Sequence, residues 1–137
     1  MPLEFADVRE HWDMVKVGLE SISQETQPDW RLEDVYASLV QGQSHLLIDT
    51  SRTKTGFMVV ESVRIPFQNA DKLLIWIAYD PEPDSLAHYE EELDALARST
   101  GHKQIEFLTP HPKLWSLGEK FGYELRWAAL NKTVGDI

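Results

Sequence analysis

The fold is decided by residues 56–123, which begin GFMVVESV (56–63), continue KLLIWIAY (72–79) and end LGEKFGY (117–123). The first run is short and rich in β-branched and apolar residues, and the second is apolar at nearly every position. A run of this kind is typical of a central strand that is covered on both faces. We therefore predict that residues 72–79 lie in the middle of a sheet, between residues 56–63 and a further strand.

A helix joins this central strand to the further strand. Ser85 is a good N-cap, and the apolar residues after it recur at helical spacing until Gly101. Residues 103–108 (KQIEFL) then form the next strand. Because strand–helix–strand crossovers are right-handed, these residues are predicted to run parallel to the central strand.

The C-terminal part of the chain adds one more helix and one more strand. The helix is predicted at residues 111–121 and ends at Gly122, which suits a left-handed cap. The last strand is predicted at residues 123–130.

Two helices and a strand precede the deciding stretch. Apolar residues recur at three- and four-residue steps in residues 7–23 and again after Pro28, where the second helix ends at Gly42. Residues 45–49 and 56–63 are joined by a polar turn, as in an antiparallel hairpin. This order predicts an α/β protein of three layers, with a mixed central sheet flanked by helices.

Length, charge and residue content exclude several classes of site and partner. The chain has 137 residues, no Cys and a formal net charge of −10. This length suits one domain, predicted at residues 1–130, with residues 131–137 as a C-terminal tail. The absence of Cys excludes disulfides and Cys-ligated zinc, and the negative charge opposes nucleic-acid binding. The five His residues lack metal-ligand spacing, so no metal is expected, and no apolar run is long enough for a membrane helix. We expect a soluble, cytoplasmic protein.

The penultimate helix resembles a motif of the GNAT acetyltransferases, which commonly reads Asn-x-x-Ala-x-x-Leu-Tyr-Glu-Lys-x-Gly-Phe. This sequence has the leucine, the Glu-Lys pair and the glycine followed by an aromatic residue. It lacks the asparagine, the alanine and the tyrosine of the motif. The resemblance implies a GNAT-like fold and acetyl-coenzyme A as the cofactor to consider. Since that tyrosine is the family's frequent general acid, glycine in its place removes a catalytic group. The corresponding positions here are His111, Leu114, Leu117, Gly118, Glu119, Lys120, Gly122 and Tyr123.

The phosphate loop of that family, Gln/Arg-x-x-Gly-x-Gly/Ala, has no counterpart in this chain. Residues 81–85 read PEPDS at the corresponding turn, and no glycine occurs between Ile75 and Arg98. Two prolines lack N–H donors, and Glu82 and Asp84 would repel a pyrophosphate. Ordinary coenzyme A binding is therefore not expected.

The chain also looks like small GNAT-like proteins of tailed phages and prophages, in which this loop is often eroded. The similarity lies in residues 34–36, 73–78, 88–93 and 95–98. It implies a location in the host cytoplasm or in a virion.

The resemblance to GNAT enzymes and the position along strands single out seven candidate site residues. Glu61 is the candidate general base; the alternative is a solvated side chain or a pair with Arg64. Tyr79 stands where the acyl group would meet an amine; the alternative is a packing role at the strand end. The cofactor-contacting candidates, should a cofactor bind, are Ile77, Ala78, Ser85, Leu86 and His111.

Two functions are carried forward from the sequence. The first is a GNAT-fold binding or structural protein that acts through protein contacts after losing cofactor binding. The second is a divergent N-acetyltransferase that transfers an acetyl group from acetyl-coenzyme A to a small-molecule amine. Homodimerisation stays open in both cases.

Overall fold

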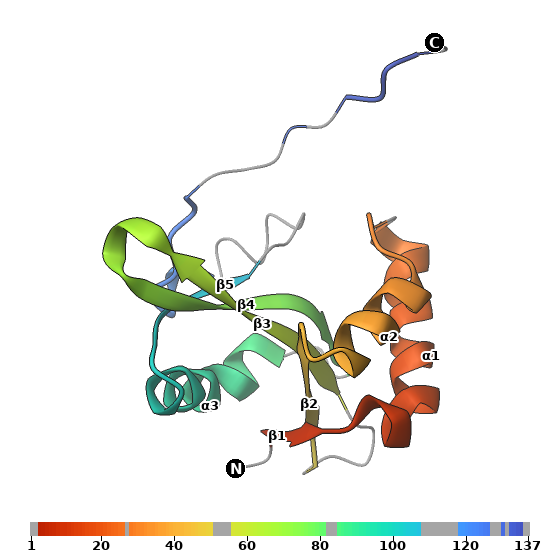
Figure 1. The fold of residues 1–137 in the computed structure, drawn as a ribbon, viewed down its shortest axis with the longest axis horizontal. Coiled ribbons are helices and arrows are strands. Elements are labelled where there is room, and N and C mark those ends of the chain that lie inside the picture. Colours follow the sequence, from red (N-terminus) through yellow and green to blue (C-terminus); the bar gives the residue numbers. More distant parts are fainter. Residues whose placement is uncertain are drawn as a thin grey trace.

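The computed structural model describes residues 3–26, 28–50, 56–81, 85–107, 118–126, 130 and 132–135, with residues 85–88 described by their main chain alone. Five strands and three α-helices are placed in these ranges (Figure 1). In chain order they are β1 (Leu3–Ala6), α1 (Val8–Thr26), α2 (Leu32–Val40), β2 (His45–Asp49), β3 (Phe57–Ile65), the 3-10 turn η1 (Pro66–Gln68), β4 (Ala70–Tyr79), α3 (Ser85–Ser99) and β5 (His102–Phe107).

The five strands form one mixed sheet in the order β1-β2-β3-β4-β5. The first three pairings are antiparallel, and β4 pairs with β5 in parallel. The prediction that residues 72–79 lie between residues 56–63 and 103–108 is confirmed. Strand β1 was not predicted, because its four residues bury only Leu3 and carry no clear alternation.

Helices cover both faces of the sheet, as predicted for three layers. Helices α1 and α2 lie on one face and α3 lies on the other (Figure 1). Each face has its own apolar core. The core under α3 contains Leu3, Leu47, Met58, Val60, Leu73, Ile75, Tyr89, Leu93, Leu96 and Ala97, and the core under α1 and α2 contains Val8, Val15, Leu19, Val35, Leu46, Ile48, Phe57, Val59 and Ile77.

The helix ends follow the local sequence signals. Asp7 caps α1, because the backbone N–H of Arg9 donates to Asp7 Oδ1 at 2.9 Å. Gly42, Gly101 and Gly122 have φ angles of 79°, 78° and 87°, so each adopts the left-handed conformation predicted for a residue that ends a helix.

The predicted last strand is wrong over the part of it that the structure describes. Tyr123 to Arg126 have no strand pairing, residues 127–129 lie outside the described residues, and Leu130 is 95% exposed. Tyr123 instead packs edge-on against Phe107 of β5, with ring centroids 4.9 Å apart. Tyr123 is therefore held by a side-chain contact with Phe107 and not by backbone hydrogen bonds to a neighbouring strand. Of the helix predicted at 111–121, only the end from Gly118 lies within the described residues.

Helix α1 approaches the sheet most closely at Gly18. A Cβ atom at this position would lie 2.5 Å from Phe57 Cε1 and 2.9 Å from Tyr79 Cδ2. Phe57 belongs to the core under α1 and α2 and Tyr79 packs against that core, so neither ring can move aside without losing packing contacts. The absence of a side chain at residue 18 therefore sets the distance between α1 and the strands β3 and β4.

The substitution Gly18→Ala should destabilise the protein even though alanine is the better helix former. Overpacking costs typically 1–3 kcal/mol, and the 2.5 Å approach to Phe57 Cε1 places this site in the upper part of that range, about 2–3 kcal/mol, against a gain of about 1 kcal/mol in helix propensity. We expect a net loss of about 1–2 kcal/mol in the free energy of unfolding, measured by urea denaturation. The control, Glu20→Ala on the exposed side of α1, should change stability by less than about 0.5 kcal/mol. A Gly18→Ala protein as stable as the unaltered one would contradict the close packing.

Candidate functional site

A β-bulge in β4 interrupts the centre of the sheet. Val59 lies opposite Ile77 and Val60 lies opposite Ile75, so Trp76 is an extra residue on β4. The bulge reverses the alternation of side chains, because Ile75 faces the core under α3 whereas Ile77 faces the core under α1 and α2. Bulges bend a strand and increase its twist, and they often lie beside functional sites.

The described pairing of the two parallel strands does not extend past this bulge. The last described pair joins Ile75 to Phe107, the last residue of β5, and residues 108–117 lie outside the described residues. Within the described residues, Ile77 to Tyr79 pair with β3 alone, and the bulged Trp76 has no ladder partner. The backbone N–H and C=O groups on their other side can therefore bind an extended ligand. We call this end of β4, residues 76–79, the β4 opening.

The predicted cofactor-contacting residues are only partly described. Ile77 is buried in the core, whereas Ala78 is exposed at the β4 opening. Ser85 begins α3, but the side chains of Ser85 and Leu86 are not described. His111 lies outside the described residues, so its predicted place beside the opening stays a prediction.

Tyr79 closes β4 as a packed aromatic residue. Its ring lies 5.5 Å from that of Phe57, at an interplanar angle of 32°, and contacts the site of Gly18 on α1. This position agrees with the alternative given for Tyr79, a packing role at the strand end. Its half-buried side chain nevertheless stands beside the β4 opening.

Glu61 is remote from Tyr79. On β3 it lies opposite Leu74, whereas Tyr79 lies opposite Phe57, four residues away. At about 3.3 Å per residue the two positions are roughly 13 Å apart, so their side chains do not form one constellation. Arg64 does not pair with Glu61; it faces the Asp71 carboxylate at 3.5 Å. Alternation along β3 puts Arg64 and Glu61 on opposite faces.

A buried polar pair that the sequence did not reveal lies beneath the start of α3. The hydroxyl of Tyr89, in the second turn of α3, donates to Asp49 Oδ2 at the end of β2, at 2.6 Å. Asp49 is fully buried and Tyr89 is 2% exposed. Gly56 adjoins this pair, because a Cβ atom there would lie 2.9 Å from the carbonyl oxygen of Tyr79 and 3.2 Å from the Tyr89 hydroxyl. The pair fixes the start of α3 against the strands that end beside the β4 opening.

The sequence offered little signal for this pair. Asp49 reads as the polar residue that ends a strand, and Tyr89 reads as one member of an apolar stripe. The glycine at position 56 was the one available sign of a close approach.

Removal of the Tyr89 hydroxyl should destabilise the protein substantially. Tyr89→Phe keeps the ring but takes one donor from a buried carboxylate, which costs about 1–3 kcal/mol. Thermal or urea unfolding measures the loss. Tyr36→Phe removes a phenolic hydroxyl from the other face of the sheet and is the matched control. A Tyr89→Phe protein that unfolds at the same midpoint as the unaltered protein would contradict the importance of the pair.

The C-terminal segment packs against β5 and α3. Gly118 is buried, and a Cβ atom there would lie 3.4 Å from Tyr123 Cβ and 3.5 Å from Phe107 Cζ. The side-chain direction of residue 118 thus points into packed aromatic rings. A Cβ atom at these distances would make ordinary van der Waals contacts, whereas a side chain as large as tyrosine would require the two rings to move.

Tyr123 lies beside two carboxylates of α3. Burial raises the pKa of Tyr123, and the charges of Glu90 and Asp94 raise it further. Burial likewise raises the pKa of Glu90, and the neighbouring Asp94 carboxylate adds to the effect. An ionised Glu90 therefore costs folding free energy at neutral pH.

Glu90→Gln should stabilise the protein at neutral pH and not at acidic pH. A raised folded-state pKa means that the contribution of Glu90 is fully present below its ordinary pKa of 4.5 and is lost as pH rises through the folded-state value. Glutamine avoids this loss, and relief of a like-charge pair at four-residue spacing contributes up to about 0.5 kcal/mol. Melting curves at pH 7.5 and at about pH 4 test this, with Glu91→Gln on the same helix as the control. If both variants gained the same stability at pH 7.5, the gain would come from the change in net charge and the prediction for Glu90 would be wrong.

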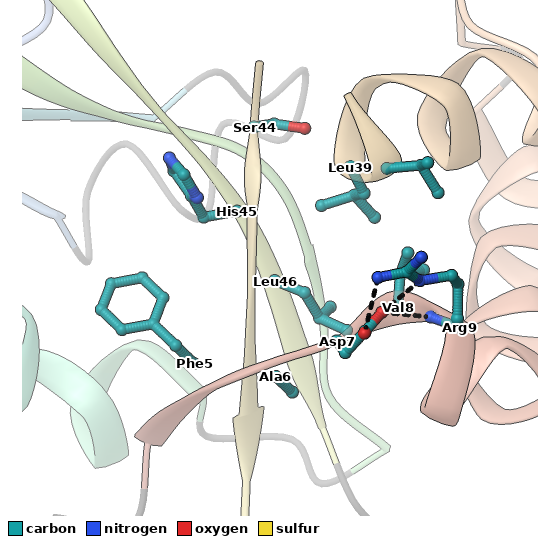
Figure 2. A pocket seen from close by; sticks show the side chains of 10 residues that line it. Phe5, Ala6, Asp7, Val8, Arg9, Leu39, Ser44, His45 and Leu46 are labelled. Atoms are coloured by element: carbon teal, nitrogen blue, oxygen red, sulfur yellow. Dashed lines mark hydrogen bonds and ion pairs between the residues drawn. The ribbon is translucent and has the colours of Figure 1, made fainter. Parts of the chain in front are cut away.

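A shallow hollow of about 280 Å³ lies at the other edge of the sheet, where β1 meets α1, α2 and β2 (Figure 2). Phe5 and His45 border it, with their rings edge-on at 6.1 Å. Asp7 and Arg9 form an ion pair at 3.0 Å on its rim. None of the predicted site residues lines this hollow.

Two classes of site find no support among the described residues. No group of three or more His, Asp or Glu side chains is placed to hold a metal ion there. None of the described helices is long and apolar enough to cross a membrane.

The backbone is similar to those of solved acetyltransferases. A probable acetyltransferase superimposes with a TM-score of 0.72 at 14% identity, covering 100% of this chain and 99% of that one. Ribosomal-protein-alanine N-acetyltransferase from Brucella melitensis biovar Abortus 2308 gives a TM-score of 0.72 at 13% identity, covering 98% and 100%. A transcriptional regulator from Bacillus halodurans C-125 gives 0.69 at 12% identity, covering 96% and 98%.

No protein-family model matches the chain, and no curated protein matches its sequence. At identities of 10–14% the structural likeness establishes the fold alone. The chain therefore has the GNAT fold, a mixed sheet between helical layers, as the sequence predicted.

Proposed function

We propose that this protein is a GNAT-fold binding protein that does not bind coenzyme A in the ordinary way. The observation that carries the proposal is the sequence PEPD at residues 81–84. Strand β4 ends at Tyr79 and α3 begins at Ser85, so these residues make the connection that corresponds to the phosphate loop of GNAT enzymes.

The chemistry of this connection does not fit a pyrophosphate. Phosphate loops work because glycines allow several backbone N–H groups to approach the phosphates at a helix N-terminus. Pro81 and Pro83 lack N–H groups, and Glu82 and Asp84 bring two negative charges. The helix dipole contributes about 0.3–1 kcal/mol toward an anion, which is comparable with the repulsion from one nearby carboxylate.

The β4 opening is the candidate contact site for a different occupant. Its backbone groups lack a strand partner on the β5 side among the described residues, and Ala78 is exposed there. A protein segment in extended conformation suits such an edge, and a second copy of this chain is one candidate. The proposal includes an origin among phage-encoded GNAT-like proteins, which the sequence resembles, and a location in the host cytoplasm or in a virion.

The second candidate function is N-acetyl transfer to a small-molecule amine. The bulge at Trp76 favours it, and so does the end of β4, which has no strand partner on the β5 side among the described residues. In this function Tyr79 would stand near the acceptor. Glu61 could act as a base only for a substrate that spans the roughly 13 Å between the two positions.

Acetyl-coenzyme A should bind weakly near neutral pH, with a dissociation constant no tighter than about 1 mM, or about −4 kcal/mol. Replacement of Glu82 and Asp84 with glycine should improve binding measurably, because it removes the repulsion and adds backbone freedom. Added salt should help the unaltered protein slightly by screening the repulsion. Isothermal titration calorimetry measures all three.

The control removes the same amount of charge elsewhere. Glu20→Gln with Glu25→Gln on α1 should leave the affinity unchanged, which separates the local effect from net charge. Micromolar binding to the unaltered protein would overturn the first function and favour acetyl transfer.

A further inference from the structure

Three polar side chains form a hydrogen-bonded chain on the α3 face of the sheet. Ser62 lies on β3, Thr100 follows the end of α3, and His102 begins β5. His102 Nε2 lies 2.9 Å from Ser62 Oγ, and His102 Nδ1 lies 2.7 Å from Thr100 Oγ1. The imidazole therefore joins a serine on one side of β4 to a threonine on the other.

Thr100 determines which atoms donate and which accept in this series of hydrogen bonds. Its hydroxyl has one proton and lies 2.7 Å from the backbone carbonyl oxygen of Leu96, to which it donates. Thr100 Oγ1 is then an acceptor for the N–H at Nδ1 of His102. A neutral imidazole carries one ring proton, so Nε2 is left with a lone pair that accepts the proton of the Ser62 hydroxyl. This is the order of nucleophile, base and orienting group that activates a serine.

We propose that Ser62 is an acyl-accepting nucleophile, with His102 as its general base and Thr100 as a positioning residue, toward small activated esters and acyl thioesters. Ser62 Oγ attacks the carbonyl carbon of the donor and His102 Nε2 takes the hydroxyl proton. The new bond joins Ser62 Oγ to the acyl carbon, and the C–O or C–S bond of the donor breaks. The leaving phenolate or thiolate departs, and the proton passes from His102 to it or to water.

The site is accessible and separate from the β4 opening. Ser62 is exposed, so a donor in solution can reach its hydroxyl. It lies opposite Leu73 on β4, three residues before Trp76 and six before Tyr79, which corresponds to roughly 10–20 Å along the strand. Acylation of Ser62 therefore does not depend on whether coenzyme A binds at the other end of β4.

The chemistry can be tested with p-nitrophenyl acetate on the full chain. Release of p-nitrophenolate gives the rate, and mass spectrometry of tryptic peptides locates the acetyl group. Ser62 is the only serine of the peptide 55–64 (TGFMVVESVR), and fragment ions distinguish its acetylation from that of Thr55. A general base contributes about 10²–10⁴-fold, so Ser62 should be acetylated at least about 100-fold faster than Ser99 in the same molecule. Ser99 is a matched internal control, because its hydroxyl bonds to the Leu96 carbonyl oxygen and not to an imidazole.

Variants separate catalysis from a structural role. His102→Asn should slow acetylation of Ser62 about 100-fold, and Ser62→Ala should abolish the label in peptide 55–64. Thr100→Val should slow the reaction to a smaller extent. The variant keeps His102 as the general base but removes the hydrogen bond that orients the imidazole. Ser99→Ala should change nothing.

Circular dichroism checks that each variant is folded, and the comparison of Ser62 with Ser99 in the unaltered protein needs no variant. Two results would overturn the proposal. One is equal acetylation of Ser62 and Ser99 in the unaltered protein. The other is a folded His102→Asn protein that labels Ser62 at the original rate.

Discussion

Burial of β4 on both faces is the constraint on which the rest of the structure depends. The strand contributes Leu73 and Ile75 to the core under α3 and Ile77 to the core under α1 and α2. Both helical layers are therefore anchored to the same ten-residue strand. Because the strand is apolar almost throughout, it cannot lie at an edge without exposing one set of these side chains to water.

The bulge at Trp76 makes this double burial compatible with an open strand end. Ile75 and Ile77 face opposite sides of the sheet because of the bulge, and the described pairing with β5 reaches the same point, Ile75. Among the described residues, the strand thus changes within one residue from pairing on both sides to pairing with β3 alone. Gly18 completes the arrangement, since the missing side chain lets α1 lie directly on Phe57 and Tyr79.

Helix α3 is tied to the sheet near both of its ends by polar contacts. Near its start, the buried hydrogen bond from Tyr89 to Asp49 holds the helix beside the end of β4. At its end, Thr100 connects the helix to His102 and Ser62. The first contact is inaccessible and stabilises the fold, whereas the second is accessible to solvent and suits chemistry. The same helix carries Glu90 and Asp94, whose charges oppose ionisation of Tyr123.

The sequence by itself determined the order of elements from α1 to β5 and the position of β4, but not β1. Strong local signals carried these predictions: an all-apolar run for β4, helical apolar stripes for α1 to α3, and glycines at positions 42, 101 and 122 where the backbone turns left-handed. The sequence also determined the chemistry of the connection at residues 81–84, because charge and the absence of N–H groups are properties of the residues themselves.

Only the tertiary structure decided which distant residues meet. A bulge is a difference of one residue between two strands, so Trp76 could not be identified from β4 alone. The contacts of Asp49 with Tyr89 and of Ser62 with His102 each join residues 40 positions apart, and no local pattern encodes such a pairing. The same reason separates Glu61 from Tyr79: both suit a site when considered singly, but their registers on β3 and β4 place them roughly 13 Å apart.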